Sequence, residues 1–362
     1  MMVNTSIVND NYNKIEKLGE GSFGSVWKVT KKDDPEKKVI ALKIIYLPND
    51  RAAEEAEKEV DILKRLTPCN PSVVCYYGSK KLKLTEIGKP LMLIEMEYID
   101  GETLTKFSER FRNNRDVDLY KHLVALTIDI AKGMKFLHSN GIIHRDIKPD
   151  NIMIEKGTNQ PKLIDVGLGC FVQKVCILPP LEEKKEVSVA KGPSFQEVQR
   201  RLQEMKAASG VTPVSPKVKE KPPTQFRLDA DIEEEYSFSS SGEGPRKSEL
   251  VKMYDINEQG ERIYEECCSG RSGSPYYSSP EVLLESIAYP ASDVWSLGAT
   301  LNYAASGKPI YPAQTMNQLL EKMKYDPVPV KTPNRIFNRL LTLCLHRNPN
   351  IRATDQELID FR

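Results

Sequence analysis

The sequence has almost no net charge and no long hydrophobic run. Lysine and arginine number 52 and aspartate and glutamate 51, which leaves a formal charge of +1 over 362 residues. This balance gives no indication of a nucleic-acid-binding or membrane-binding surface. The apolar runs are far shorter than the roughly 20 residues that span a bilayer. We therefore expect no binding to nucleic acid or membrane.

Histidine is scarce, and cysteine is odd in number. The four histidines have no zinc-ligand spacing to the cysteines, so a metal held by nitrogen or sulfur is not expected. The seven scattered cysteines favour reduced thiols over a disulfide framework. Residues 1–13 lack the basic and apolar regions of a signal peptide. Together these features predict a cytoplasmic protein, with the nucleus as the alternative.

The most informative stretch, residues 144–151, reads H-R-D-I-K-P-D-N. It lies between a helix-like run at 119–138 and a strand-like run at 152–154. Loops presented by rigid elements are where catalytic side chains tend to lie. The stretch resembles the H-R-D-L-x-x-x-N catalytic loop of the eukaryotic-type serine/threonine protein kinase family, with Ile147 in place of the leucine.

The resemblance assigns a role to three side chains of this loop. Asp146 would accept the proton of the substrate hydroxyl, and Lys148 would stabilise the transferring phosphoryl group. Asn151 would bind Mg²⁺. A lysine two residues after the aspartate is the pattern of the serine/threonine kinases, so we expect serine and threonine acceptors.

A second motif, G-x-G-x-x-G-x-V, comprises Gly19, Gly21, Gly24 and Val26. Glycines let a backbone approach phosphate oxygens closely and donate N–H groups to them. The motif alone is weak, because dinucleotide-binding folds place it at a strand-to-helix turn. Here strands are predicted on its C-terminal side, at 25–30 and 39–46, which favours a phosphate-covering loop between strands. A glycine hairpin without a ligand is the alternative.

Lys43 lies inside the second of these strands, where an isolated lysine would be costly without a partner. A helix predicted at 49–66 supplies one. By resemblance, Glu59 would pair with Lys43 and hold it on the ATP phosphates. In the alternative, Glu59 is one of several solvated acids on this helix, with Glu54, Glu55 and Glu57 as its neighbours.

Strands predicted at 73–79 and 91–98 lead into a segment that resembles the hinge of the kinase family. The resemblance implies that backbone groups of Glu97 and Ile99 bind the adenine edge, beside a gatekeeper Met96. It also assigns Ala41 and Met153 to the nucleotide site. A methionine in an apolar strand is more often plain core, and only the position of Met96 directly before the hinge favours the functional interpretation.

Residues 165–167 read D-V-G where the family has D-F-G. Asp165 follows Asn151 by 14 residues, enough for a short hairpin that brings both to one Mg²⁺ site with ATP. The departure is Val166. In the family the phenylalanine joins an apolar column, here Leu63, Tyr76 and His144 by position. Its loss would cost roughly 1–3 kcal/mol of packing, part of which Tyr76 offsets.

Three later motifs extend the resemblance. G-S-P-Y-Y-S-S-P-E at 273–281 resembles the segment that cradles a peptide substrate, with Ser274 near the catalytic aspartate and lysine. Asp293 would bind the backbone of the catalytic loop. Arg352 would pair with Glu281. A peptide-cradling segment favours protein substrates over small molecules.

Residues 172–266 form an insertion rich in proline, serine, lysine and glutamate. Such a composition cannot bury enough apolar surface to offset the entropy of ordering. We therefore expect disorder, with one helix at 195–208. A tolerated surface loop and a docking arm for partner proteins are equally compatible with this composition.

These features predict an α+β, bilobal kinase-like fold. A tail at 1–12 would precede a kinase domain at 13–362, with an N-lobe at 13–98 of antiparallel sheet and one main helix, and a mostly helical C-lobe at 99–362. We expect a monomeric, ATP- and Mg²⁺-dependent serine/threonine protein kinase. A weakly active or inactive pseudokinase acting as a binding scaffold is the main alternative, and a small-molecule kinase is a third.

Overall fold

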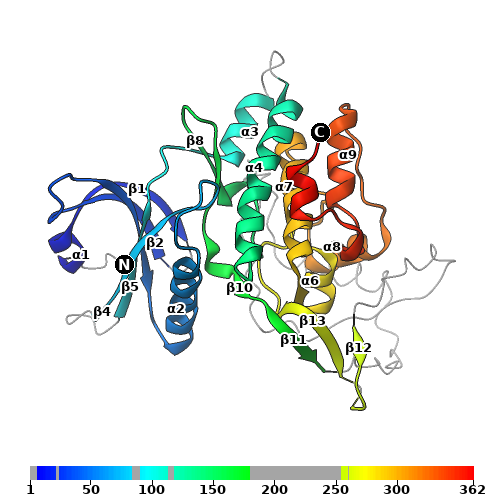
Figure 1. Cartoon of the computed structure of the whole chain (residues 1–362), viewed down its shortest axis with the longest axis horizontal. Coiled ribbons are helices and arrows are strands. Elements are labelled where there is room, and N and C mark those ends of the chain that lie inside the picture. Colours follow the sequence, from blue (N-terminus) through cyan, green and yellow to red (C-terminus); the bar gives the residue numbers. More distant parts are fainter. Residues whose placement is uncertain (1–5, 22–23, 84–89, 113–117, 180–253, 260) are drawn as a thin grey trace, which may run out of the picture. The chain divides into compact units, whose positions relative to one another are not determined.

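The computed structural model describes residues 6–21, 24–83, 90–112, 118–179, 254–259 and 261–362. Its N-terminal part is a five-stranded antiparallel sheet in the order β1-β2-β3-β5-β4 (Figure 1). The strands are β1 (Tyr12–Gly21), β2 (Gly24–Lys31), β3 (Val39–Tyr46), β4 (Tyr76–Lys83) and β5 (Pro90–Glu97). The central strand β3 alternates little in burial, as expected for a strand covered on both faces.

The main helix of this part is α2 (Asp50–Arg65). It begins where the Asn49 side chain accepts a hydrogen bond from the backbone N–H of Ala52 at 2.9 Å, which caps the helix. One face of α2, including Val60 and Leu63, is buried in the main hydrophobic core. The helix therefore has a fixed rotation about its axis, which decides which of its glutamates reaches the sheet.

The C-terminal part is built around two long helices, α4 (Leu119–Ser139) and α7 (Pro290–Ser306), which pack against each other (Figure 1). Most of α7 is buried, including Trp295, as is typical of a central helix. The surrounding helices are α3 (Leu104–Arg112), α6 (Pro280–Glu285), α8 (Met316–Tyr325), α9 (Arg335–Cys344) and α10 (Asp355–Ile359).

Short strands and single turns carry the loops of the C-terminal part. Strands β6 (Gly101–Thr103), β8 (Ile152–Glu155) and β9 (Pro161–Leu163) form one sheet, and β7 (Ile142–Ile143) pairs with β10 (Cys170–Phe171). The 3₁₀ turns are η1 (Pro149–Asn151), η2 (Val166–Leu168) and η3 (Pro349–Ile351). The hairpin of β8 and β9 returns the chain to the site, as its predicted length required.

The α+β fold predicted from the sequence is confirmed, with an antiparallel sheet and one main helix before a mostly helical part. The tail predicted at 1–12 contains a short helix, α1 (Ser6–Asn11). Val8 and Tyr12 are buried in a second core cluster beneath the sheet, so these residues are part of the packed structure. Across the described residues, no helix is both long and apolar enough to cross a membrane.

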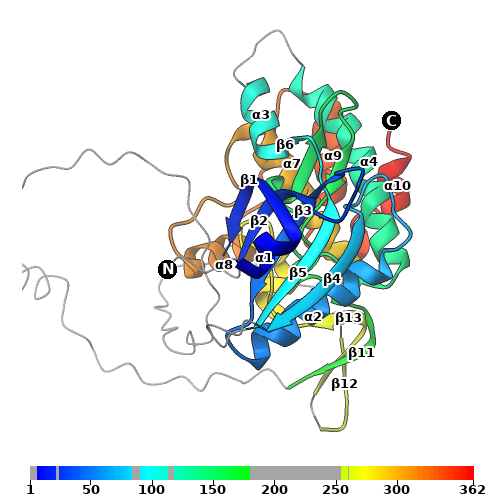
Figure 2. The same cartoon turned by 90° about the vertical axis from the view of Figure 1, so that its left-hand side faces the viewer.

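The prediction of disorder over 172–266 is wrong at both ends of that range. Strand β11 (Gln173–Leu178) pairs with β13 (Arg262–Ser269), which also pairs with β12 (Asp255–Ile256) and with β14 (Ile287–Ala288). Figure 2 shows these strands extending from the helical part. Pairing with a segment about 90 residues away orders them, which local composition does not reveal. Residues 180–253, and with them the predicted helix at 195–208, lie outside the described residues.

The expectation of reduced, scattered thiols is wrong for six cysteines. Disulfides join Cys69 to Cys75, Cys170 to Cys268 and Cys176 to Cys267. Two of these bonds link segments 98 and 91 residues apart, so chain folding rather than spacing brings their sulfur atoms together. Cys344 is free and buried.

Candidate active site

A lysine between two carboxylates lies where the sheet, α2 and η2 meet. Lys43 Nζ is 2.6 Å from Glu59 Oε1 and 2.9 Å from Asp165 Oδ1. The predicted partner Glu59 is thus the glutamate of α2 that contacts Lys43. Its neighbours Glu54, Glu55 and Glu57 lie elsewhere on the helix, and Glu57 pairs with Lys81 at the surface.

Burial and charge act in opposite directions on these three groups. Burial alone would lower the pKa of Lys43, but the carboxylates of Asp165 and Glu59 raise it, so the ammonium stays charged. Lys43 lowers the pKa of Asp165, whose side chain is half exposed. Burial raises the pKa of Glu59, only partly offset by Lys43. The arrangement keeps one accessible carboxylate ionised beside a fixed cation.

The glycine-rich motif lies in the hairpin of β1 and β2, where Gly21 is opposite Gly24. A Cβ on Gly24 would lie 1.8 Å from the carbonyl oxygen of Ile44, so packing alone requires glycine at this position. A Cβ on Gly19 would meet no atom within 4 Å. Protein packing therefore does not explain glycine at position 19, which is consistent with a ligand approaching it.

The predicted nucleotide-contacting residues lie near Lys43 in the strand register. Val26 is opposite Lys43, and Ala41 is opposite Met96, the predicted gatekeeper. Both Met96 and Met153 are half-buried and pack against the main core cluster. Ile99 is buried. Their contacts with adenine remain predictions.

The predicted hinge residue Glu97 has a side-chain function that the sequence did not indicate. Its Oε1 is 2.5 Å from Lys162 Nζ on β9, and its Oε2 accepts a hydrogen bond from the backbone N–H of Cys75. The Glu97 N–H in turn donates to the Cys75 carbonyl oxygen at 2.9 Å. Glu97 therefore ties the end of β5 to the C-terminal part. The sequence could have indicated this contact, because Lys162 lies in a buried strand and a buried lysine requires an acidic partner.

Three hydrogen-bond donors converge on the carboxylate of Asp146. Its Oδ2 accepts from Lys148 Nζ at 2.7 Å and from Asn151 Nδ2 at 2.8 Å. Its Oδ1 accepts from the backbone N–H of Ser274 at 2.9 Å. Lys148 Nζ also donates to Ser274 Oγ at 2.9 Å. All three residues predicted as catalytic, together with Ser274, are thus in direct contact.

The loop that carries Asp146 is held by Asp293 of α7. Asp293 accepts the backbone N–H groups of His144 at 2.7 Å and Arg145 at 2.9 Å. Arg145 has a φ of 63°, a strained value for a side-chain-bearing residue, and these bonds help to hold it there. The sequence predicted this contact of Asp293.

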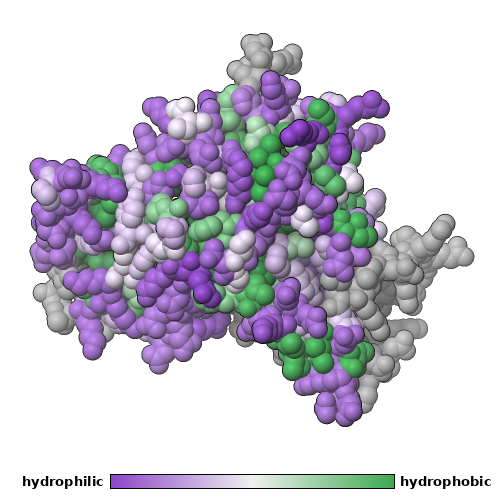
Figure 3. All heavy atoms as spheres, viewed as in Figure 1, coloured by the Kyte–Doolittle hydropathy of each residue, from purple (hydrophilic) through white to green (hydrophobic). Residues whose placement is uncertain are grey.

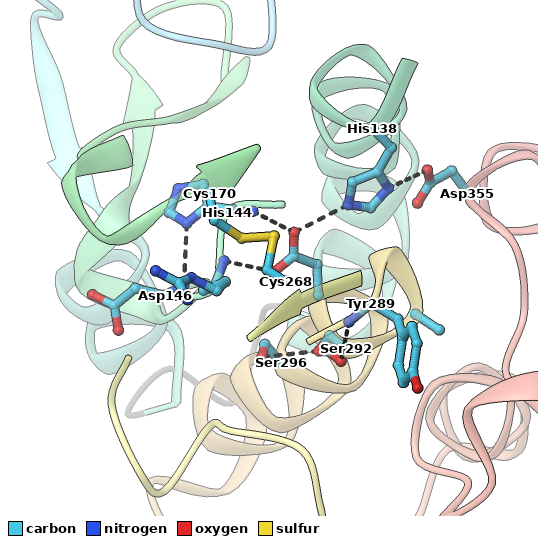
Figure 4. A network of polar contacts seen from close by, with 12 residues as sticks. His138, His144, Asp146, Cys170, Cys268, Tyr289, Ser292, Ser296 and Asp355 are labelled. Atoms are coloured by element: carbon cyan, nitrogen blue, oxygen red, sulfur yellow. Dashed lines mark hydrogen bonds and ion pairs between the residues drawn. A yellow bond between two sulfur atoms is a disulfide. The ribbon is translucent and has the colours of Figure 1, made fainter. Parts of the chain in front are cut away.

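His138, which the sequence analysis did not single out, completes this support. Its Nε2 is 3.0 Å from Asp293 Oδ2, and its Nδ1 is 2.6 Å from Asp355 Oδ2. Figure 4 shows the His138 side chain joined to Asp355. Burial would lower the pKa of His138, but the two carboxylates raise it to about 9. The imidazole is therefore protonated at neutral pH. A histidine at the end of an apolar helix gave no warning of this role.

The segment that leads to Ser274 is fixed by backbone crowding and by an ion pair. Gly273 has a φ of 99°, and a Cβ there would lie 2.1 Å from the carbonyl oxygen of Arg145. Glu281 makes a bidentate pair with Arg352 at 2.7 and 2.8 Å, as the sequence predicted. The first contact shows how closely this segment approaches the catalytic loop, and the second ties its far end to Arg352 beside η3.

Val166, the departure from the family pattern, is 1% exposed and packs in the main core cluster with Leu63 and Tyr76. Turn η2 packs against α2 at this point. The position predicted for the apolar column is therefore filled, although by a smaller side chain.

Two of these residues offer ligands that suit Mg²⁺. The ionised carboxylate of Asp165 is half exposed, and the amide nitrogen of Asn151 is committed to Asp146, so its carboxamide oxygen is left for a metal ion. Hard oxygen ligands are those that Mg²⁺ prefers. Among the described residues, no three acids, histidines or cysteines gather around one metal position. Oxygen atoms from elsewhere, such as nucleotide phosphates, would have to complete the shell.

Comparison with known proteins agrees with this geometry. The protein kinase domain model matches residues 12–177 and 246–361, so the chain belongs to the protein kinase domain family. The resemblance drawn from the sequence is thereby confirmed.

Individual relatives carry the same family label. The chain is 24% identical over 356 residues to the serine/threonine-protein kinase pakE of Dictyostelium discoideum, which covers 97% of this chain and 27% of pakE. It is 33% identical over 161 residues to the cyclin-dependent kinase B2-1 of Arabidopsis thaliana, covering 44% and 50% of the two chains. Over 158 residues, it is 36% identical to pakH of Dictyostelium discoideum, covering 44% and 28%. The chain thus matches half or less of the length of these relatives.

Proposed function

We propose that the chain transfers the γ-phosphoryl group of ATP to serine and threonine hydroxyls of proteins, with Mg²⁺ as the metal. The observation that carries the proposal is the set of contacts around Asp146, where Lys148, Asn151 and the backbone of Ser274 meet one buried carboxylate. Phosphoryl transfer depends mainly on positioning and on neutralising charge, and this set supplies both.

In this proposal Asp146 orients the acceptor hydroxyl and takes its proton. Lys148 bridges Asp146 and Ser274, which places a cation between the catalytic loop and the segment predicted to hold the peptide. ATP would supply the transferable phosphoryl group, and Mg²⁺ would neutralise the negative charge of its phosphates. Lys43, held by Glu59, would bind the phosphates, while Asp165 and Asn151 would bind the metal. Gly19, Gly21 and Gly24 would cover the phosphates.

The experiment measures labelled phosphate transfer from Mg·ATP to a generic serine/threonine substrate. We expect transfer by the unaltered chain and none by Asp146→Asn, which removes the charge that holds Lys148. Asp129→Asn is the matched control, because Asp129 is a partly exposed α4 residue that pairs with Lys132 away from the site.

If neither the unaltered chain nor the control transfers phosphate while ATP still binds, the proposal fails and the chain acts as a binding scaffold. Peptides that differ only in a serine, threonine or tyrosine acceptor test the predicted acceptor class. The cyclin-dependent kinase among the relatives suggests regulatory partners as a subject for affinity capture. Monomeric state and a cytoplasmic or nuclear location stay predictions, checked by light scattering and cell fractionation.

A further inference from the structure

Four buried cysteines lie on three strands, with two of the cysteines before and two after residues 180–253. Cys170 is on β10 and Cys176 on β11, while Cys267 and Cys268 are consecutive on β13. The exposed fractions of their side chains are 6%, 2%, 0% and 2%. The two bonds therefore join the beginning and the end of the segment between Asp165 and Glu281.

Strand β11 buries little of its surface apart from its pairing with β13. Of its six residues only Cys176 is buried, and among the described residues the strand pairs on one side only, with β13. Val175 and Ile177 are 49% and 55% exposed, and the space-filling view shows a hydrophobic patch over these strands (Figure 3). A strand with few buried contacts opens at low free-energy cost. The bond from Cys176 to Cys267 therefore adds a covalent link to the backbone pairing of β11 with β13.

The other bond lies beside the catalytic loop. Cys170 is opposite Ile143 in the β7–β10 pair, directly before His144, and it packs in a small apolar cluster with Ile143 and Val282. Figure 4 shows the bond between Cys170 and Cys268 next to His144 and Asp146. From Cys268 the chain runs only six residues to Ser274, whose backbone and hydroxyl contact Asp146 and Lys148.

We propose that the Cys170–Cys268 and Cys176–Cys267 pairs form a thiol–disulfide control site that sets the position of the peptide-holding segment. This inference rests on the proposed function, because the control site would regulate the proposed active site. In the oxidised form the two bonds fix β13, and through it Ser274, against the catalytic loop. In the reduced form β11 separates from β13 and Ser274 loses its fixed position, while Lys43, Glu59 and Asp165 are unaffected.

The co-reactant is a small-molecule disulfide such as oxidised glutathione. A thiolate of the protein attacks one sulfur atom of that disulfide and releases one small thiol. The second protein thiolate then attacks the mixed disulfide, which forms the protein bond and releases a second thiol. Each protein disulfide is thus formed by a two-electron oxidation of two protein thiols. The small-molecule disulfide is reduced, and both protons end on the two thiols that it releases. Because all four side chains are buried, exchange requires local opening of β11 and is slow.

The test uses the full chain, incubated for long periods with excess oxidised glutathione or with dithiothreitol. Mass spectrometry of non-reduced peptides reports the bonds, and steady-state kinetics with peptide and ATP reports the site. We expect both bonds after oxidation and a value of kcat/KM for peptide at least about fivefold higher than in the reduced form. The affinity for a non-hydrolysable ATP analogue should be equal in the two forms.

Variants sharpen the assignment. The double variant Cys170→Ser/Cys268→Ser keeps only the Cys176–Cys267 bond, so oxidation should raise its kcat/KM for peptide less than that of the unaltered chain. The matched control, Cys69→Ser/Cys75→Ser, removes the third bond, which closes a loop of the N-terminal part, and should keep the full response. If the first double variant does not fold, the comparison of oxidised and reduced unaltered protein decides the question without any substitution.

Two outcomes overturn the inference: the linked peptides are absent after oxidation, or they form with no change in kcat/KM for peptide. A chain with no activity in either form contradicts the proposed function instead. In that event hydrogen exchange of residues 269–278 decides the inference. Slower exchange in the oxidised form supports it, and equal exchange refutes it.

Discussion

Two cations in this chain each lie between two carboxylates, and they serve different purposes. Lys43 contacts Glu59 and Asp165 where the N-terminal sheet meets η2, while His138 contacts Asp293 and Asp355 between helices of the C-terminal part. The Asp165 side chain is 50% exposed, whereas those of Asp293 and Asp355 are 1% and 14% exposed.

The exposed carboxylate is able to bind a ligand, whereas the buried carboxylates serve a structural role. Asp165 retains an accessible carboxylate oxygen for a metal ion or a ligand. Asp293 has both oxygens occupied by backbone N–H groups and the imidazolium, so it can only hold the catalytic loop. The two cations also differ in their pKa. The pKa of Lys43 is raised, so its ammonium stays charged at every pH used in an assay, whereas His138 has a pKa of about 9 and loses its proton in mildly alkaline solution.

Among the substitutions that test this comparison, Asp165→Asn is expected to have the largest effect on phosphate transfer. Removing this charge should lower phosphate transfer by at least about 100-fold, because Asp165 is the carboxylate proposed to bind the metal ion of the reaction. The free energy of unfolding should change by less than about 1 kcal/mol, since a half-exposed ion pair stabilises little. Kinetics together with urea denaturation measures both quantities.

The control for this variant is Asp61→Asn, because Asp61 is an exposed aspartate of α2 in a surface ion pair with Lys64. It should leave both quantities unchanged. An Asp165→Asn protein with full activity would contradict the role given to the exposed carboxylate.

The opposite result is expected from His138→Gln. Losing a buried cation leaves Asp293 and Asp355 without their counter-charge, which should lower the free energy of unfolding by about 3–5 kcal/mol. The folded fraction should retain activity within a few-fold, since His138 does not contact the reacting groups. His122→Gln, an exposed position on the same helix, is the matched control. Loss of activity at unchanged stability would refute the assignment of His138 to support.

The pH dependence of stability sharpens the same contrast. The pKa of His138 is raised from 6.5 to about 9 in the folded chain, so the folded state binds the proton more tightly than the unfolded state. This stabilisation is fully present below pH 6.5 and is lost as the pH rises through 9, amounting to about 3 kcal/mol.

Urea denaturation of the unaltered chain and of His138→Gln at pH 6, 7.5 and 9 measures the stabilisation contributed by protonated His138. The difference in stability between the two proteins should shrink with rising pH. A constant difference would indicate that folding leaves the pKa of His138 unchanged, and a growing difference would indicate that His138 is neutral in the folded chain; either result contradicts the raised pKa.

The smallest effect concerns Val166, which follows Asp165 directly. Because Val166 is 1% exposed, Val166→Phe should overpack the core and cost about 1–3 kcal/mol of stability. Adding Tyr76→Leu should recover part of that loss, since Tyr76 packs against the same cluster. A double-mutant cycle in urea measures the coupling. Additive effects would show that Tyr76 does not compensate for the missing ring.

Much of the site followed from the sequence because it lies on short motifs. Asp146, Lys148 and Asn151 are within six residues of one another, and a loop of that length leaves few ways to arrange them. The Lys43–Glu59 contact was also predictable, because a lysine in an apolar strand requires a partner and the next helix is the nearest source of one.

Contacts between distant segments could not be predicted in the same way. The pairing of β11 with β13, the position of Asp355 beside His138 and the Glu97–Lys162 link each join residues far apart in the chain. The composition of 172–266 pointed to disorder, since nothing local indicates that its ends form a ladder with each other. The same applies to the cysteines, whose spacing suggested isolated thiols.

The sequence alone determined the family, the order of the elements and the identity of the groups around Asp146 and Lys43. These features depend on local hydrophobic periodicity and on chemical groups held at short range. Only the tertiary structure decided which carboxylates are closed and which are accessible, and which cysteines meet. Burial and long-range contact are properties of the folded chain, because neighbours remote in sequence exclude the water that surrounds each group in the unfolded one.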